Sequence, residues 1–178
     1  MSAPELSRLV KPRALPAEPV AIAADEAERA ALAERFGITG IPALEATVDF
    51  ATKDETVLAN GTLVATLVQP CAITHEELTY EVEEPLSLRF VPAGSVSDYA
   101  PDEEIELDSE DLDEIEYEGD AFDLGEAIAQ TLALAIDPYR EGPGAEDARR
   151  KSGITSDEEQ APSGPLAEAL AKLKTGEK

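Results

Sequence analysis

The chain has 178 residues and a formal net charge of −25. Its length suits one domain with a core of its own, and its 43% apolar content excludes a chain that is disordered throughout. Such an excess of carboxylates repels a phosphate backbone, which argues against ordinary nucleic-acid binding. No stretch approaches the roughly 20 consecutive apolar residues of a membrane span, and the N-terminus has no secretion-signal pattern. We therefore expect a cytoplasmic protein.

The first elements expected are a short strand and a helix. Residues 5–15 combine aliphatic side chains with proline, which opposes a helix and favours an extended segment. Asp25 followed by Glu28 has the spacing of a capping box, and apolar residues then recur on one helical face until Gly37 offers a stop. The pattern predicts a helix over residues 25–36.

Three strands are expected next. Residues 44–50 alternate apolar and polar side chains, which is the period of a strand with one wet face. Val57, Leu58 and Ala59 then lead into Asn60-Gly61, a dipeptide that suits a tight turn between antiparallel strands, with residues 63–68 as the returning strand. These segments predict a hairpin.

The same alternation returns over residues 78–90, where Pro85 interrupts it without changing its phase. Because proline cannot donate a hydrogen bond to a strand ladder, we expect a bulge or an edge position there. The fold class expected is α+β, an antiparallel β meander packed with two or three helices and carrying an acidic loop insertion.

The second half begins with that acidic loop, at about residues 93–113. Ile115 and Tyr117 could form a brief strand. Asp123, with Glu126 three residues later, repeats the capping pattern and predicts a helix that Pro138 ends. Its apolar stripe consists of Leu124, Ile128, Leu132 and Ala135.

The C-terminal part is expected to lie outside the domain. Residues 141–162 are rich in Gly, Pro, Ser and charge, which is typical of a flexible linker, and Pro165 can begin a helix that ends near Lys174. We predict a single α+β domain over residues 1–140, a linker over 141–162, and a terminal docking helix and tail over 163–178.

The acidic run is the main candidate site. No basic residue occurs between Arg89 and Arg140. Such a surface attracts a basic partner in a salt-dependent way, although a loop that only confers solubility would have the same composition. A calcium loop is disfavoured, because Asp111 and Asp113 lack the twelve-residue pattern with its central glycine. The expected partner-binding residues are Glu103, Glu104, Glu106, Asp108, Glu110, Asp111, Asp113 and Glu114.

The remaining chemistry is sparse. Cys71 is the only cysteine and His75 the only histidine, which excludes an internal disulfide and any zinc site built from several such side chains. Cys71 as nucleophile with His75 as base is conceivable, but no orienting or oxyanion motif lies nearby. We interpret them as a half-buried thiol and a turn histidine. We expect no catalytic residues, no metal and no cofactor.

Three segments in order resemble a known family. They are LVATLVQPCAITHEELTYEVEEPLSLRFVP from Leu63 to Pro92, YEGDAFDLGEAIAQTLALAIDP from Tyr117 to Pro138, and SGPLAEALAKLK from Ser163 to Lys174. Together they are similar to the YceD-like proteins, known as large ribosomal RNA subunit accumulation proteins. The resemblance implies a role in accumulation or processing of large-subunit ribosomal RNA and carries over no catalytic residue.

One departure from the family pattern concerns metal binding. Many relatives have Cys-x-x-Cys at the turn and a further cysteine after the helix, which suggests a metal site. Here the second position is Thr74, and no cysteine follows Tyr139. The resemblance therefore implies that this chain does without such a metal.

The leading hypothesis is a non-enzymatic accessory factor for large ribosomal subunit assembly that binds a basic ribosomal protein or a pre-ribosomal particle through its acidic face, without contacting a membrane. An alternative is a metal-dependent enzyme that processes precursor ribosomal RNA through the carboxylates. A third is a direct RNA-binding module. It would use the basic residues near the ends, Arg8, Lys11, Arg13, Arg149, Arg150 and Lys151.

Overall fold

The computed structural model describes residues 4–94 and 114–154. The chain divides into two compact units. The first comprises Met1–Pro70 and Glu77–Pro138, and the second comprises Cys71–Glu76 and Tyr139–Lys178. The terminal docking helix expected at residues 163–178 lies outside the described residues and stays a prediction.

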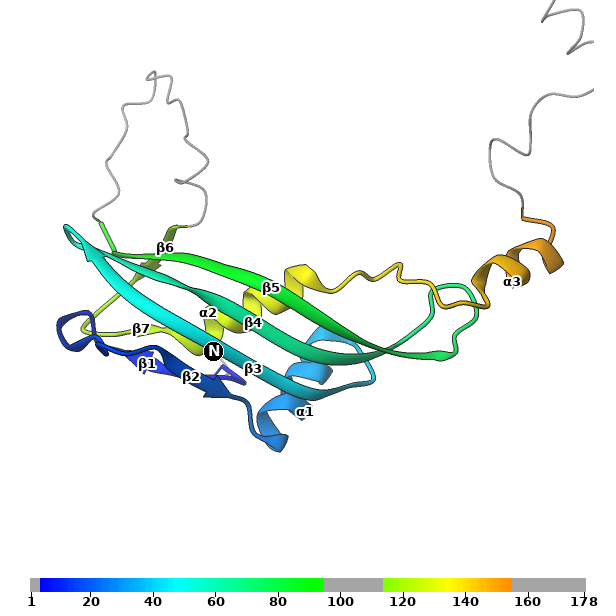
Figure 1. Cartoon of the computed structure of the whole chain (residues 1–178), viewed down its shortest axis with the longest axis horizontal. Coiled ribbons are helices and arrows are strands. Elements are labelled where there is room, and N and C mark those ends of the chain that lie inside the picture. The colour runs from blue at the N-terminus through cyan, green and yellow to red at the C-terminus, as the bar shows by residue number, and fades with distance from the viewer. Residues whose placement is uncertain (1–3, 95–113, 155–178) are drawn as a thin grey trace, which may run out of the picture. The chain divides into compact units, whose positions relative to one another are not determined.

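The main sheet of the first unit has the strand order β2-β3-β4-β5-β6 (Figure 1). From β2 to β5 the strands pair antiparallel, which confirms the predicted meander and the α+β class. The last strand, β6, pairs in parallel with β5. The strands are β2 (Val20–Ala23), β3 (Gly40–Lys53), β4 (Thr56–Pro70), β5 (Glu77–Pro92) and β6 (Glu114–Tyr117).

The turn between β3 and β4 is not where the sequence predicted it. Asn60 and Gly61 lie inside β4 and pair with β3, and the chain reverses at Asp54, whose φ is 56°. Gly61 serves close packing instead, because a Cβ at this position would collide with the carbonyl oxygen of Thr47. A strand-interior glycine and a turn glycine give the same sequence signal, so the Asn-Gly prediction was wrong.

Pro85 lies within a regular ladder. It pairs opposite Thr62, and β4 and β5 pair without a register shift along the whole of β5. Since β6 pairs only with residues 89–92, no described strand lies beside Pro85 on the side away from β4. The edge position is confirmed and the bulge is not formed.

Helix α1 (Glu26–Phe36) has the predicted ends. Asp25 accepts a hydrogen bond from the Glu28 N–H, and the Glu28 carboxylate accepts one from the Asp25 N–H, each at 2.9 Å. Gly37 adopts the left-handed conformation, with φ of 67°, and closes the last turn. Helix α1 therefore forms where local capping chemistry placed it.

Helix α2 (Leu124–Ala135) is capped by Asp123, which accepts hydrogen bonds from the N–H groups of Gly125 and Glu126. The reciprocal half of the predicted capping box is absent, because the Glu126 side chain binds Arg35 at 2.9 Å. The ion pair with Arg35, a residue of α1, thus takes the place of the expected hydrogen bond between the Glu126 side chain and the Asp123 N–H.

The N-terminal segment packs beside the start of α2. Strand β1 (Leu9–Val10) pairs antiparallel with β7 (Phe122–Asp123), and a 3-10 turn, η1 (Pro12–Ala14), follows it. A Cβ on Gly125 would lie 2.8 Å from the Arg8 backbone nitrogen, so this glycine allows the two segments to approach. The predicted strand at residues 5–15 is thus confirmed over two residues only.

Helices α1 and α2 cover one face of the main sheet (Figure 1). The alternating residues predicted to be apolar point into this layer, and among the largest fully buried side chains are Phe90, Phe122, Leu63 and Ile128. The Phe90 and Phe122 rings stack with centroids 4.0 Å apart. The other face of the sheet carries the remaining alternate residues, most of them polar, with Leu58, Val64 and Val68 of β4 among them.

The second unit contains helix α3 (Ala145–Lys151), inside the segment predicted to be a linker. Acids fill its first turn and bases its last turn, which complements the helix dipole. Glu146 and Arg150 also pair at 3.0 Å across one turn. Residues 145–151 are thus helical inside the segment whose Gly, Pro, Ser and charge content predicted a flexible linker, and the boundaries of that linker stay a prediction.

Candidate protein-interaction surface

The structure describes one of the eight predicted partner-binding residues. The other seven lie outside the described residues: Glu103, Glu104, Glu106, Asp108, Glu110, Asp111 and Asp113. Glu114 begins β6 opposite Arg89, and its Oε1 lies 3.1 Å from Arg89 Nη2. The two side chains are 25% and 24% exposed. Glu114 is therefore a partly covered carboxylate whose charge a neighbouring strand balances.

The described residues on the two sides of the acidic segment lie on neighbouring strands. The Ala93 N–H donates to the Tyr117 carbonyl at 2.9 Å, and β6 pairs with the end of β5. The Tyr117 ring lies 5.8 Å from the ring of Phe122, which belongs to the core cluster. The acidic segment is thus inserted between two points that the core fixes side by side.

A cavity of about 480 Å³ lies near these points, lined by Lys11, Pro12, Arg13, Pro92, Tyr117, Gly119 and Asp120. Its charged groups include an ion pair between Lys11 Nζ and Asp120 Oδ2 at 2.8 Å. This contact lowers the pKa of the Asp120 carboxyl, and both side chains remain largely exposed. The lining brings no nucleophile and base together, and nowhere in the described part of the chain do three or more His, Cys, Asp or Glu gather as metal ligands.

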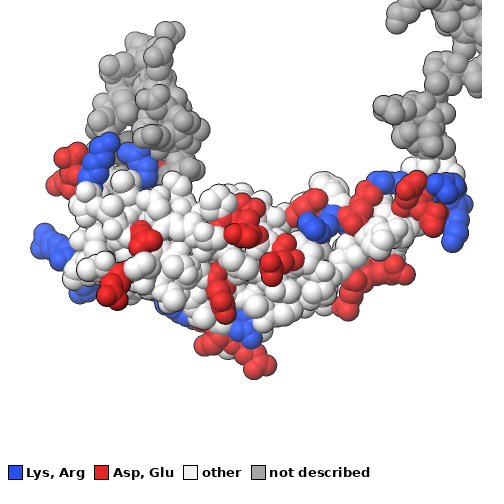
Figure 2. All heavy atoms as spheres, in the orientation of Figure 1, with Lys and Arg blue, Asp and Glu red and all other residues white. Residues whose placement is uncertain are grey.

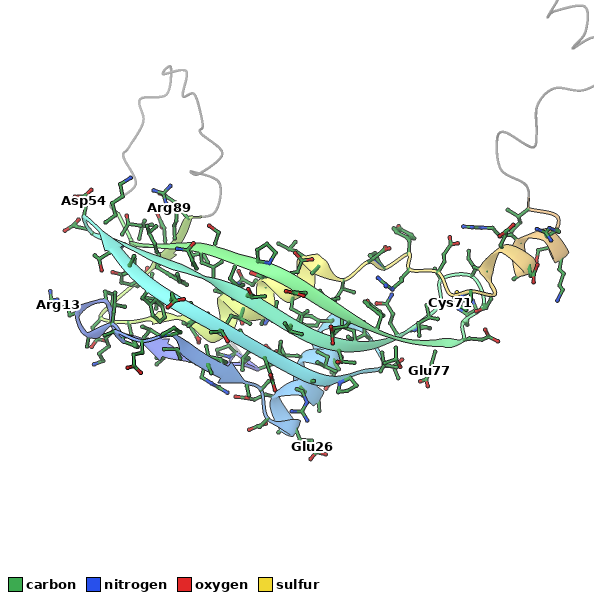
Figure 3. The ribbon with its side chains drawn as sticks, in the orientation of Figure 1. Arg13, Glu26, Asp54, Cys71, Glu77 and Arg89 are labelled. Atoms are coloured by element: carbon green, nitrogen blue, oxygen red, sulfur yellow. The ribbon has the colours of Figure 1, made fainter. Side chains whose placement is uncertain are left out.

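Cys71 lies in the turn that the chain makes after β4 (Figure 3). Its sulfur is fully buried, not half-buried as predicted, and accepts N–H bonds from Ile73 and Thr74 at 3.4 Å and from Gly142 at 3.3 Å. Hydrogen bonds from the side chain and backbone of Thr74, then from Gly142, lower the pKa of the thiol from 9.0 to about 7. These donors stabilise the thiolate.

His75 supports the turn through its backbone. Its φ is 60°, a conformation that few residues other than glycine adopt, and its N–H donates to the Cys71 carbonyl at 3.0 Å. Within the described residues, no hydrogen bond joins the imidazole to the Cys71 sulfur. The pair is arranged as a turn, in agreement with the prediction of a turn histidine.

The surroundings of Cys71 do not fit the metal site suggested for relatives. Thr74 occupies the position of their second cysteine, and the chain contains no other cysteine. The sulfur is already engaged by backbone N–H groups. A thiolate-rich metal centre needs several such ligands at one point, and this chain supplies one.

Four acidic residues on the main sheet belong to the candidate surface as well. Glu45 and Asp49 of β3 and Glu81 and Glu83 of β5 are exposed. The two-residue alternation had placed them on the polar side of their strands, but sequence reasoning gave them no function. No ion pair involves any of the four within the described residues.

One comparison with known proteins identifies a family. A family model described as "Large ribosomal RNA subunit accumulation protein YceD" matches residues 59–174, which is well over half of the chain. The chain belongs to the YceD family. The match begins inside β4 and includes β5, β6, the Cys71 turn, α2 and α3. No curated protein and no solved structure matches the chain.

The family resemblance stated from three sequence segments is thus confirmed, and the family name connects the chain with accumulation of large-subunit ribosomal RNA. None of the helices in the described part of the chain has the length and apolar character needed to cross a membrane.

Proposed function

We propose that this protein is a non-enzymatic accessory factor of large ribosomal subunit assembly that acts in the cytoplasm by binding a basic ribosomal protein. Membership of the YceD family is the single observation that carries the link to large-subunit ribosomal RNA. The distribution of charge supports the chemistry of the partner, because the chain has a formal net charge of −25.

The described cations support a protein partner over RNA. Four of the six basic residues that an RNA-binding module would use are engaged in ion pairs within the chain. The pairs are Arg8 with Glu28, Lys11 with Asp120, Arg149 with Glu141, and Arg150 with both Glu146 and Asp147. Phosphate binding needs cations that are free to replace condensed counterions. These side chains would have to give up an acidic neighbour first.

The proposed mechanism is polyanion mimicry. Ribosomal proteins bind RNA through basic surfaces, and a dense set of carboxylates offers such a surface a temporary substitute for phosphate. The acidic segment from Glu103 to Asp113 provides that density. Ribosomal RNA, with its higher charge density, then displaces the factor as the basic protein joins the growing subunit.

The test neutralises the acidic segment and measures capture of basic ribosomal proteins. The variant carries E103Q, E104Q, E106Q, D108N, E110Q, D111N and D113N, and the control carries E18Q, E26Q, E34Q and E55Q, which are exposed carboxylates outside the acidic segment. We expect the variant to retain fewer large-subunit proteins from lysate treated with ribonuclease, with a shallower dependence on salt, and the control to behave as the parent. Equal retention and equal salt dependence in variant and parent would contradict the proposal.

A second measurement separates binding from enzymatic processing. Purified protein is incubated with precursor ribosomal RNA and Mg²⁺, with the D111N and D113N variants in parallel. We expect the precursor to remain intact in every sample. Specific cleavage that is lost in either variant would establish a metal-dependent enzyme instead.

A further inference from the structure

One face of the main sheet, called the open face below, is left uncovered by every element in the described part of the chain. Helices α1 and α2 cover the opposite face, so alternate residues of β3, β4 and β5 point away from the core. On the open face the central strand β4 presents a row of uncharged side chains: Leu58, Asn60, Thr62, Val64, Thr66 and Val68. Val64, in the middle of the row, is 36% exposed and adds an apolar side chain to this face.

Carboxylates flank this uncharged row on both sides. Val64 lies opposite Glu45 on β3 and opposite Glu83 on β5. Thr66 lies opposite Glu81, and Asn60 lies opposite Asp49. Strands are spaced about 4.8 Å apart, so the two acidic rows stand about 10 Å from one another. Figure 2 shows this face with separate acidic side chains around a largely uncharged middle.

Cations are confined to one end of the open face. Lys53 closes β3 beside Asp54, and Arg89 lies toward the same end of the sheet as Asp54 (Figure 3). Arg89 pairs with Glu114 there. No lysine or arginine lies at the described open-face positions between Glu45 and Asp49 on β3 or between Glu81 and Glu83 on β5. Within the described residues, the charged side chains that flank the middle of the uncharged row are therefore all acidic.

We propose that the open face of the main sheet is a docking surface for an extended, Lys- or Arg-rich protein segment that lies along β4. Lysine and arginine have aliphatic stems and charged ends. Over β4 the stems contact Thr62, Val64 and Thr66, and the charged ends reach the carboxylates on either side. The surface thus matches a basic segment in both polarity and width, and it consists of residues distinct from the acidic segment.

The same charges disfavour other occupants. A second copy of this chain would bring its own acidic rows against Glu45 and Glu83, and a nucleic acid would bring phosphates. The inference rests on the proposed function only in taking the partner to be basic. It adds which surface holds the partner and what form the bound segment has.

The test uses the full chain and a fluorescent synthetic peptide of alternating arginine and valine. Binding is measured by anisotropy at low and at physiological salt. The face variant carries E45Q, D49N, E81Q and E83Q. The matched control carries E18Q, E26Q, E34Q and E55Q, which removes the same number of exposed charges from outside the open face. We expect at least about tenfold weaker binding for the face variant and a change within about twofold for the control.

Val64→Thr probes the aliphatic part of the surface while keeping the branched shape that suits a strand. We expect about two- to threefold weaker binding, with unchanged salt dependence, because no charge is altered. A peptide of alternating glutamate and valine should not bind. Unfolding midpoints of all variants are measured in parallel, so a loss of binding in a variant that stays folded supports the docking surface.

The outcomes separate this inference from the proposed function. If the acidic-segment variant loses the peptide and the face variant binds like the parent, the docking surface is wrong and the proposed function stands. Equal losses of peptide affinity in the face variant and in its control would also overturn the docking surface, because the net charge of the chain would then explain the binding. If neither variant alters peptide binding or capture of ribosomal proteins, both proposals fail.

Discussion

The two sides of the main sheet differ in whether their described carboxylates are paired with arginine. On the helix-covered side, described arginines form ion pairs within the chain. Arg8 donates two hydrogen bonds to the Glu28 carboxylate, at 2.6 and 2.9 Å, and Arg35 pairs with both Glu5 and Glu126. On the open side, Glu45 and Glu83 flank Val64 with no cation beside them. Because several of the few basic residues pair with acids of the same chain, they do not neutralise the carboxylates of the open face, and that face stays negative.

Carboxylates of the two kinds therefore contribute differently to the free energy of unfolding. Those bound to arginine stabilise the fold, and their loss removes a contact. Those on the open face repel one another and stabilise nothing within the described residues, so their presence is explained by solubility or by a partner.

The largest effect is expected in the aromatic cluster beneath the sheet. Phe122 is fully buried and stacks on Phe90. Phe122→Ala should lower the free energy of unfolding by about 3–5 kcal/mol, because it removes a large apolar side chain and leaves a cavity. Val64→Ala on the open face should cost less than about 1 kcal/mol. Urea unfolding followed by circular dichroism measures both, and similar losses would show that the open face is covered by something in the folded chain.

An intermediate effect is expected for the Arg8–Glu28 pair. The hydrogen bond from Arg8 lowers the pKa of Glu28 below its ordinary 4.5. The stabilisation is therefore present above pH 4.5 and is lost as the pH falls through the lower pKa of the folded state. Glu28→Gln should cost about 1 kcal/mol at neutral pH and make the loss of stability on acidification shallower.

Glutamine at position 28 can still accept the Asp25 N–H, so the capping box is kept and the substitution isolates the ion pair. Arg8→Gln removes the other partner of the pair, and with it the hydrogen bonds to the carbonyl oxygens of Ser7 and Ala23. Its unfolding midpoint at neutral pH should therefore fall further than that of Glu28→Gln, and both variants should show the same shallower loss of stability on acidification. A steeper acid transition in Glu28→Gln would show that the ion pair is not the source of the pH dependence.

The smallest effect is expected on the open face. The variant E45Q, D49N, E81Q and E83Q should unfold within about 0.5 kcal/mol of the parent, and on the stable side, because repulsion between like charges is relieved. The measurement is the urea midpoint at low and high salt. A clear loss of stability would mean that these carboxylates have partners inside the protein, which would break the comparison between the two faces.

Local signals in the sequence predicted local structure well. Asp25, Glu28 and Gly37 fixed the ends of α1 because capping depends on neighbours within four residues. The same logic found Asp123 but misassigned Glu126, whose carboxylate is taken by Arg35 from another helix. For Gly61 the dipeptide signal was ambiguous, and only the pairing of β3 with β4 shows that close approach requires it.

For the candidate surface, too, local patterns predicted some features and missed others. Composition alone located the acidic run, and alternation alone put Glu45, Asp49, Glu81 and Glu83 on polar positions. That Glu114 faces Arg89 depended on β6 joining β5 in parallel, which no local pattern encodes. Sequence reasoning therefore found the carboxylates without being able to tell which of them are already paired.

The family, the negative charge, the period of each strand and the N-cap of each long helix can be read from the amino-acid sequence alone, because they depend on composition and on residues close along the chain. The neighbours of each strand, the pairing of arginines with glutamates and the sheet face that no described element covers follow only from the three-dimensional arrangement. Those outcomes depend on contacts between distant segments, where the packing of the whole core selects one arrangement.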